Sequence, residues 1–337
     1  MIKAKAFLLS CVVAALMPCS AQCAENSPRA IASSTAFDAL LERAKKATDV
    51  NEAEQLYDKA IQLNPNSAVA YEGRGRKRLT AGNQQGLPDV DKAIVLDDKF
   101  AKAYRTRGWA KLVAGNYKPA LEDLDNAIRL GDDTNWVYEY RGACYLDLNQ
   151  LQPACNDFEA ALQRDPKSID ALLNMAMVQQ KLGEYPASLA FVERAIAIDP
   201  KNASIYRIRG DYKQDHLSDY AGAIKDYSES IGLGANADSY RGRAQANVRL
   251  KHWSHALSDA DSALRLKPRD AMALNIRGCA RNNSGDSNAA ISDFNQAISI
   301  DPGNFTFYVN RAQAYENVGK VSLAEKDRAK ANALQNE

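Results

Sequence analysis

The sequence has few of the residues that catalysis or metal binding requires. It holds three histidines among 337 residues, and it has no Cys-x-x-Cys pair, no glycine-rich phosphate loop and no nucleophile elbow. These motifs are the usual carriers of metal, phosphate and acyl chemistry. Paired aspartates such as Asp97 with Asp98 fit turns and helix caps better than acid–base catalysis. We therefore expect no enzyme, no cofactor and no metal site.

An excess of one charge is also missing. Lys and Arg number 43 and Asp and Glu number 42, so the chain has neither a basic surplus nor an acidic tail. Proteins that bind nucleic acids usually carry a basic patch or stripe. The balanced charge therefore predicts that the chain does not bind nucleic acid.

Long apolar runs are confined to the N-terminus. Lys3 and Lys5 precede an uncharged run from Ala6 to Met17, which Pro18 ends. The run is too short to span a bilayer, and small residues follow it. This layout predicts a secretory signal peptide over residues 1–21. A lipid anchor is the weaker alternative, because the residues around each candidate cysteine fit it poorly.

Residues 22–33 are small and polar, and they predict a flexible leader. No other apolar stretch approaches membrane length, so we expect no transmembrane span. The expected location is the periplasm of a Gram-negative bacterium or the outside of the cell.

A repeated pattern fills the rest of the chain. A tyrosine or leucine recurs at intervals of 34 at Tyr104, Tyr138, Leu172, Tyr206, Tyr240, Leu274 and Tyr308. Four residues after each stands Gly or Ala. A fixed period of this length, with apolar residues at helical spacing in both halves, predicts stacked helical hairpins.

Nine units begin near residues 34, 68, 101, 135, 169, 203, 237, 271 and 305. In the third unit we expect helix A over residues 101–114 and helix B over residues 118–130. Gly115 can end helix A in the left-handed conformation. Pro88, in the second unit, fits only in the first turn of a helix.

The pattern resembles the tetratricopeptide repeat family. The shared features are an aromatic residue at position 4, small residues at positions 8 and 20, a bulky residue at 24, Ala at 27 and Pro at 32. Phe158, Ala161 and Pro166 are examples of the last three. The resemblance covers residues 34–337 and implies an all-α, right-handed superhelical solenoid of about nine helix-turn-helix repeats.

The chain departs from the family at position 7, where Arg replaces the usual Leu in seven repeats. The same seven repeats carry Asp at position 23, which gives the pairs Arg74 and Asp89, Arg107 and Asp123, Arg141 and Asp157, Arg209 and Asp226, Arg243 and Asp259, Arg277 and Asp293, and Arg311 and Asp327. The other two repeats have Leu40 with Leu56 and Met175 with Phe191. A partly buried arginine without its carboxylate is costly, so this covariation predicts direct ion pairs between helices A and B. The alternative is an arginine ladder that grips an acidic ligand.

Cys144 and Cys155 lie on the two helices of the fourth repeat, and two readings stay open for them. They form a disulfide that closes the hairpin in an oxidising compartment, or they are buried thiols, because a disulfide requires a narrow range of Cα distances. His216, His252 and His255 fit surface turns better than a zinc site.

The resemblance implies that the A helices line a concave surface. Carried onto this chain, its positions give Arg105, Trp109, Trp136, Glu139, Tyr140, Asn174, Met177, Arg207, Asp211, Arg241 and Gln245. Trp, Tyr and Arg dominate the energetics of many interfaces. Packing between adjacent A helices is the alternative role, above all for Trp136. No two adjacent repeats supply the Lys/Asn/Asn/Lys/Arg set that holds a peptide C-terminus in some family members.

The sequence therefore predicts an exported scaffold that binds a protein or an extended peptide in its groove, with no catalysis of its own. The alternative is a cell-envelope adaptor that associates with carbohydrate or peptidoglycan, in which Trp109, Trp136 and Tyr140 stack on sugar rings. The identity of the partner and the oligomeric state stay open.

Overall fold

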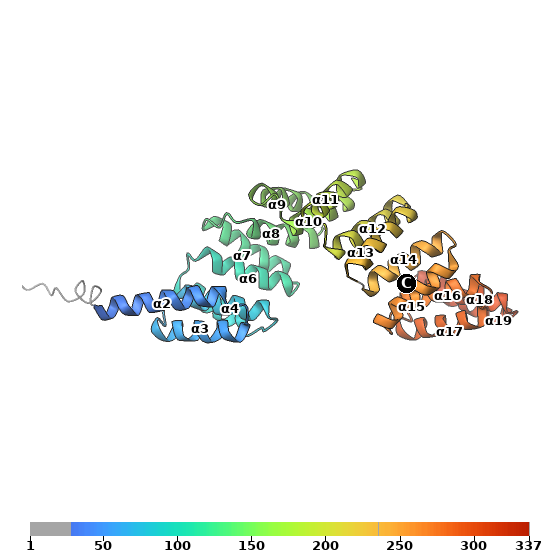
Figure 1. Cartoon of the computed structure of the whole chain (residues 1–337), viewed down its shortest axis with the longest axis horizontal. Coiled ribbons are helices and arrows are strands. Elements are labelled where there is room, and N and C mark those ends of the chain that lie inside the picture. Colours follow the sequence, from blue (N-terminus) through green and yellow to red (C-terminus); the bar gives the residue numbers. More distant parts are fainter. Residues whose placement is uncertain (1–27, 235, 337) are drawn as a thin grey trace, which may run out of the picture. The chain divides into compact units, whose positions relative to one another are not determined.

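The computed structural model describes residues 28–234 and 236–336. These residues form eighteen α-helices, α2 to α19, with no strand among them. The architecture is an all-α repeat solenoid, as the period predicts (Figure 1). The expected signal peptide, residues 1–21, and the first part of the expected leader, residues 22–27, lie outside the described residues.

The chain divides into two compact units, unit 1 up to Asn149 and unit 2 from Gln150. The helices of unit 1 are α2 (Pro28–Lys46), α3 (Val50–Leu63), α4 (Ala68–Thr80), α5 (Gly86–Leu96), α6 (Ala101–Val113), α7 (Tyr117–Arg129) and α8 (Asn135–Asp147). The helices of unit 2 are α9 (Leu151–Arg164), α10 (Ile169–Lys181), α11 (Tyr185–Ile198), α12 (Ala203–Leu217), α13 (Tyr220–Leu233), α14 (Ala237–Arg249), α15 (Trp253–Leu266), α16 (Ala271–Asn283), α17 (Ser287–Ile300), α18 (Phe305–Asn317) and α19 (Val321–Gln335). Even-numbered helices are the A helices of the repeats and odd-numbered helices are the B helices.

Short polar side chains and left-handed residues set the ends of the helices. Ser67 Oγ accepts a hydrogen bond from the Ala70 amide, and Asp270 Oδ1 accepts one from the Ala273 amide, so both cap the start of an A helix. Gly115 follows α6 with φ of 76°, as expected. The observed bounds of α6 and α7 lie within one residue of the predicted ones.

The start of α2 corrects the boundary of the expected leader. Residues 28–33 were assigned to the leader, whereas the structure places them in the first turns of α2.

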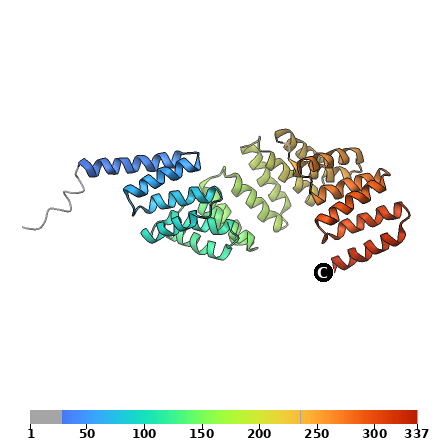
Figure 2. The same cartoon turned by 90° about the horizontal axis from the view of Figure 1, so that it is seen from below.

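Within each unit the hairpins stack in chain order. In unit 1, α4 packs on α5 and α6 on α7, and the neighbouring A helices α4, α6 and α8 touch one another in turn. In unit 2 the A helices α12, α14, α16 and α18 do the same. Figures 1 and 2 show these helices lying side by side within their units. The A helices α4, α6, α12, α14, α16 and α18 thus each pack on their hairpin partner and touch a neighbouring A helix.

Small residues at position 8 allow the two helices of a hairpin to approach closely. A Cβ atom on Gly278 would lie 2.6 Å from Cε1 of Phe294 on the partner helix. Where this position is alanine, the partner is smaller: Ala244 packs in one cluster with Ala260. The glycine therefore leaves room for a large aromatic side chain at position 24.

We predict opposite effects for two glycine-to-alanine substitutions. A Cβ atom on Gly75 would lie 2.6 Å from the carbonyl oxygen of Gly86, and a backbone atom cannot rotate away. Gly75→Ala should therefore destabilise the second hairpin by about 1–3 kcal/mol. Nothing lies within 4 Å of a Cβ atom on helical Gly232, so Gly232→Ala should stabilise α13 by about 0.5–1 kcal/mol.

Hydrogen exchange of the α4 and α13 amides measures each effect locally, which suits an array whose repeats need not unfold together. Slower exchange in α4 of Gly75→Ala would contradict the steric argument. Faster exchange in α13 of Gly232→Ala would show that this helix needs the glycine.

Six arginines at position 7 form two-pronged ion pairs with the aspartate of their own repeat. In each, Nε and Nη2 donate to the two carboxylate oxygens over 2.6–3.1 Å, in the pairs Arg74 and Asp89, Arg107 and Asp123, Arg209 and Asp226, Arg243 and Asp259, Arg277 and Asp293, and Arg311 and Asp327. The seventh pair, Arg141 with Asp157, has one member in each unit and stays a prediction.

The guanidinium group of such an arginine also contacts the preceding repeat, and Arg107 is the example. Nη1 of Arg107 lies 2.9 Å from Asp91 on α5, and the ring of Tyr104 lies 5.6 Å from its Cζ. The hydrogen bond with Asp123 raises the pKa of Arg107 above its ordinary value. One charged side chain thus joins three helices from two repeats. In the first repeat, which lacks the pair, Leu40 packs on the apolar cluster that contains Leu56.

We predict that Arg243→Leu destabilises the seventh repeat more than the double change Arg243→Leu with Asp259→Leu. The single change leaves the buried Asp259 carboxylate with only the Asn247 amide, 3.3 Å away. A stranded buried charge costs several kcal/mol. We expect about 2 kcal/mol here, because water reaches part of the Arg243 side chain.

Urea unfolding together with hydrogen exchange of α14 and α15 measures this difference. Arg265→Leu, which removes an exposed arginine from α15, is the matched control. If the double variant is at least as unstable as the single one, the ion pair does not decide the stability of this hairpin.

Candidate functional site

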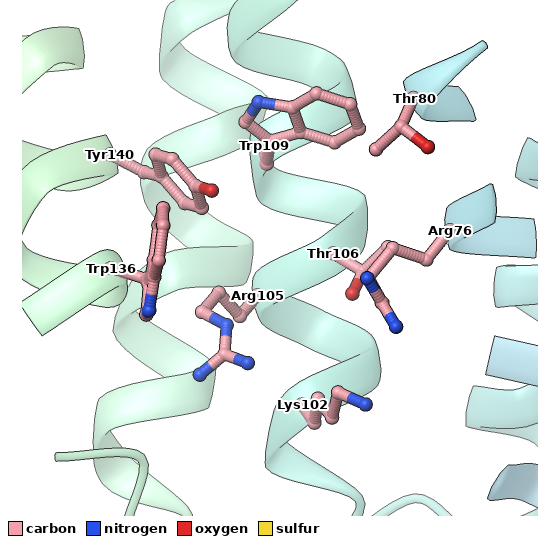
Figure 3. Close-up of a pocket in the computed structure, with 8 residues that line it drawn as sticks. All are labelled: Arg76, Thr80, Lys102, Arg105, Thr106, Trp109, Trp136 and Tyr140. Atoms are coloured by element: carbon pink, nitrogen blue, oxygen red, sulfur yellow. The ribbon is translucent and has the colours of Figure 1, made fainter. Parts of the chain in front are cut away.

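A pocket of about 440 Å³ lies on the A helices of unit 1. We call it the cationic–aromatic pocket. It is lined by Arg76 and Thr80 of α4, by Lys102, Arg105, Thr106 and Trp109 of α6, and by Trp136 and Tyr140 of α8 (Figure 3). The A helices of three consecutive repeats therefore build one site.

Helical spacing explains why these side chains converge. Positions 102, 105, 106 and 109 are three, four and seven residues apart, and they share one face of α6. Arg76 and Thr80 share a face of α4 in the same way, as do Trp136 and Tyr140 on α8. Because α4, α6 and α8 lie next to one another, the three faces meet.

Three aromatic rings form one half of the pocket. The ring centroid of Tyr140 lies 6.5 Å from that of Trp109 and 6.3 Å from that of Trp136. These separations are typical of interacting aromatic pairs. Trp136 nevertheless keeps 49% of its surface exposed. Its packing is therefore incomplete, and its ring remains accessible to a ligand.

Cations form the other half, and a buried carboxylate holds two of them. Glu72 of α4 is fully buried, and Thr106 Oγ1 donates to its Oε1 over 2.8 Å. Lys102 Nζ lies 2.9 Å from Glu72 Oε2, and Arg76 Nε lies 3.4 Å from Oε1. The Lys102 and Arg76 side chains keep about a third of their surface exposed. Glu72 therefore holds these two charges in place, while part of each side chain stays exposed to solvent.

Arg105 is the third cation of the pocket and is more fully engaged. Its Nη1 donates to both oxygens of Asp132 over 2.9 and 2.6 Å, and to Thr134 Oγ1 over 2.7 Å. Asp132 precedes α8 and also accepts from the Thr134 amide. Arg105 therefore ties α6 to the start of α8. With Glu72 and Asp132 counted, the three cations leave one net positive charge.

The structure corrects one predicted groove residue of unit 1. Glu139 does not line the pocket; it is buried and accepts a hydrogen bond from Asn135 Nδ2 over 3.1 Å. Arg105, Trp109, Trp136 and Tyr140 do line it. Arg76, Thr80, Lys102 and Thr106 also line it, although they were not among the predicted groove residues. They occupy positions 9, 13, 2 and 6 of their repeats, and the resemblance implies that positions 2, 5, 6, 9, 12 and 13 face the groove.

A second pocket, of about 220 Å³, lies in unit 2. We call it the acidic pocket. It is lined by Leu173, Asn174, Ala176, Met177 and Gln180 of α10, Ser188 and Val192 of α11, and Ile208, Asp211, Tyr212, Asp215 and His216 of α12. Three predicted groove residues, Asn174, Met177 and Asp211, are among them.

Asp211 is the most perturbed charge of the acidic pocket. It contacts the hydroxyl of Tyr227 over 2.8 Å and Nη1 of Arg207 over 2.5 Å. Burial raises the pKa of Asp211 above its ordinary value, while the Tyr227 hydroxyl and Arg207 act in the opposite direction. Nearby, the His216 ring stacks on Tyr185 with centroids 5.0 Å apart.

The remaining predicted groove residues of unit 2 do not line either pocket. Arg207 neutralises Asp211 from the side. Arg241 pairs with Asp238 and with Asp270, the capping residue of α16. This arginine therefore ties two A helices together in the way that Arg105 does in unit 1. Gln245 is half-buried.

Three cysteines and three histidines lie among the described residues. Cys155 is buried and lies 3.7 Å from the sulfur of Met175. Its pairing with Cys144, which belongs to the other unit, stays a prediction. The rings of His252 and His255 lie 6.1 Å apart. Within residues 28–234 and 236–336, no group of three or more His, Cys, Asp or Glu side chains could hold a metal ion. In the same ranges, no helix has both the length and the apolar character to cross a membrane.

Comparison with known proteins shows which repeat family parts of the chain resemble. Family models described as the tetratricopeptide repeat match residues 145–211 and residues 272–304. These two segments are similar to the tetratricopeptide repeat. The described residues outside the matched segments form hairpins of the same kind.

Relatives in sequence share only part of their length with the chain. Sperm-associated antigen 1 of Mus musculus is 33% identical over 89 residues, which are 26% of this chain and 10% of that protein. Small glutamine-rich tetratricopeptide repeat-containing protein 2 of Saccharomyces cerevisiae is 32% identical over 103 residues, 30% of this chain and 29% of that protein. The chain therefore spans less than a third of the length of either relative.

Solved structures with tetratricopeptide-like folds resemble the chain over longer stretches. The APC/C hetero-tetramer Cut9-Hcn1 has a TM-score of 0.58 at 16% identity, and the match covers 90% of this chain and 60% of that one. A tetratricopeptide repeat protein from Parabacteroides merdae has a TM-score of 0.55 at 19% identity, over 73% of this chain and 99% of that one. These likenesses show the fold.

We predict that Tyr227→Phe raises the pKa of Asp211 further, because the variant loses a hydrogen bond that favours the charged carboxylate. A carboxyl group with a raised native pKa binds more protons in the native state than in the unfolded state. Its contribution to stability therefore falls as pH rises from the unfolded pKa through the native one. In the variant this fall should extend to higher pH.

Carbon NMR of the Asp211 carboxyl group, followed as a function of pH, measures the shift. Tyr206→Phe serves as the control, because Tyr206 lies on the same helix as Asp211 but its hydroxyl donates to the carbonyl oxygen of Pro200. An unchanged or lowered Asp211 pKa in Tyr227→Phe would show that the hydroxyl does not stabilise the carboxylate.

Proposed function

We propose that this chain is an exported scaffold that binds an extended peptide, or an extended segment of a protein, along its A helices and catalyses no reaction. The observation that supports this function most is the cationic–aromatic pocket. The A helices of three consecutive repeats contribute to it, so a ligand that spans repeats can use it. The tetratricopeptide repeats of the chain support a binding role, since such proteins act as interaction scaffolds.

The dimensions of the A-helix surface suit an extended chain. Packed helices lie about 8–10 Å apart, and an extended peptide advances about 3.3 Å per residue. A peptide that crosses α4, α6 and α8 therefore meets a new helix about every three residues. The pocket volume of about 440 Å³ also falls within the usual range for ligand sites.

Carbohydrate binding is the second candidate, and the accessible Trp136 ring is the observation that favours it. A neutral sugar could stack on this ring, but it would leave the exposed parts of Lys102 and Arg76 without a partner. The peptide is therefore the first choice, and sugars are included in the test.

Export is supported by the pattern of residues 1–21, where basic residues precede an apolar run and small residues follow it. Mass spectrometry of the mature chain from cell fractions tests it. We expect the chain in the periplasm or the medium, with its N-terminus removed near residue 21. A full-length chain confined to the cytoplasm would refute export and leave the binding function untouched.

We predict that Trp136→Ala weakens peptide binding about 30-fold. Truncation of an aromatic hot spot typically costs about 2 kcal/mol, and this side chain is exposed enough to be removed without loss of the fold. The assay is a selection of 12-residue peptides against the mature chain, followed by fluorescence anisotropy with the selected peptides.

The matched control is Lys118→Ala, which changes an exposed residue of the B helix α7. Circular dichroism shows whether each variant keeps its helices. Equal affinity of Trp136→Ala and the unchanged chain would refute the assignment of the pocket. If no peptide is selected while a panel of neutral oligosaccharides binds, the carbohydrate function replaces the peptide function.

A further inference from the structure

The two halves of the cationic–aromatic pocket define a more specific ligand. We propose that the pocket recognises a peptide segment in which a carboxylate lies two to three residues from an aromatic or bulky apolar side chain. This inference deepens the proposed function and rests on it, because it names the chemical class of the peptide.

The aromatic half selects the apolar side chain. Trp109, Tyr140 and Trp136 come from two neighbouring helices and surround one part of the pocket (Figure 3). Their ring faces are wide and apolar, and an aromatic ligand side chain that packs against them gains about 0.5–1.5 kcal/mol beyond its burial. The exposed face of Trp136 is the open entrance to this half.

The cationic half selects the carboxylate. Arg76 Nε is buried 3.4 Å from Glu72 and makes no hydrogen bond to the described residues, while about a third of the Arg76 side chain remains exposed. Lys102 Nζ has the buried Glu72 on one side, and about a third of its side-chain surface remains exposed. A ligand carboxylate placed between the exposed parts of Lys102 and Arg76 would form ion pairs with both cations.

The buried Glu72 makes this half ready for a single negative charge. It fixes Lys102 and Arg76 before the ligand arrives, which reduces the entropy lost on binding. Two cations and one internal carboxylate leave one positive charge on this half. One carboxylate neutralises that charge, whereas a phosphate group, with nearly two negative charges, would leave an excess of negative charge.

The spacing within the ligand follows from helix geometry. Between the two halves of the pocket the ligand segment follows α6 before it crosses to the neighbouring helices. Lys102 and Trp109 lie seven residues apart on α6, which corresponds to about 10 Å along the helix axis. An extended peptide covers this distance in about three residues. The flexible Lys102 side chain shortens the gap, so two to three residues separate the carboxylate from the apolar side chain.

The test uses the full mature chain and fluorescein-labelled 12-residue peptides of serine and glycine. The first peptide carries Phe-Ser-Ser-Glu at its centre and has blocked ends. Its partners replace Glu by Gln or Phe by Ala, and a fourth places the carboxylate at a free C-terminus three residues after Phe. Fluorescence anisotropy at low and high salt gives the affinities.

We expect the Gln peptide and the Ala peptide to bind at least tenfold more weakly than the first peptide. High salt should weaken the first peptide and leave the Gln peptide nearly unchanged, because only the carboxylate contact is electrostatic. The salt comparison needs no variant of the protein. If the peptide with the free C-terminus also binds, a terminal carboxylate can supply the negative charge; if it does not bind, the carboxylate must be that of an internal side chain. The proposal itself is decided by the first peptide, whose failure to bind more tightly than the Gln peptide would overturn it.

In the protein, Arg76→Gln with Lys102→Gln should remove the preference for Glu over Gln, while Lys118→Gln should keep it. Lys102→Gln with Glu72→Gln removes both members of this ion pair together, so no charge is stranded, and it serves if the first variant does not fold. We expect that variant to reduce the preference severalfold.

The outcomes separate this inference from the proposed function. If peptides selected from random libraries bind through Trp136 but show no preference for a carboxylate, the inference is wrong and the peptide-binding function stands. If neither selected nor designed peptides bind, both are wrong. Binding of a glucuronate-containing oligosaccharide in place of the peptides would also overturn both.

Discussion

The ion pair between Arg at position 7 and Asp at position 23 is the contact on which the repeat array depends. Its two parallel hydrogen bonds join the helices of one hairpin, and the remaining nitrogen of Arg107 reaches Asp91 in the repeat before. Removing one partner would strand a charge that is largely sealed from water. The pair therefore specifies which helix faces lie together more sharply than apolar contact alone would do. A leucine can slide over its neighbours, whereas a two-pronged ion pair has one geometry.

Where one side of an A helix is committed to such a pair, the opposite side can vary without loss of the fold. In α6 that side carries Lys102, Arg105 and Trp109; in α12 it carries Asp211. The two pockets differ in charge although their helices are built alike. Function therefore resides in the side chains at the groove positions and not in the hairpin itself.

Buried carboxylates recur inside the candidate site. Glu72 lies beneath Lys102 and Arg76, and Asp132 holds Arg105. The protein thus holds these cations in place by pairing them with buried carboxylates, as it does in the arginine–aspartate pairs of the hairpins. The two kinds of pair differ in exposure. The aspartates at position 23 are enclosed by their hairpins, whereas Lys102 and Arg76 keep part of their side chains accessible to a ligand. The same interaction serves stability in one place and recognition in the other.

The period of 34 by itself determined the helices, their order and the pairing of Arg with Asp, because a spacing that recurs through the chain reports contacts within one hairpin. The resemblance to the tetratricopeptide repeat implied that Arg105, Trp109, Trp136 and Tyr140 share a surface, and all four line the pocket. Only the tertiary structure decided that Glu139 is buried, that Arg241 is held by Asp270 and that Glu72 organises a pocket. Those outcomes depend on side chains that lie about one repeat away in sequence and on how closely neighbouring helices approach. A periodic pattern records the helix face that a residue occupies, but not the neighbour that covers it.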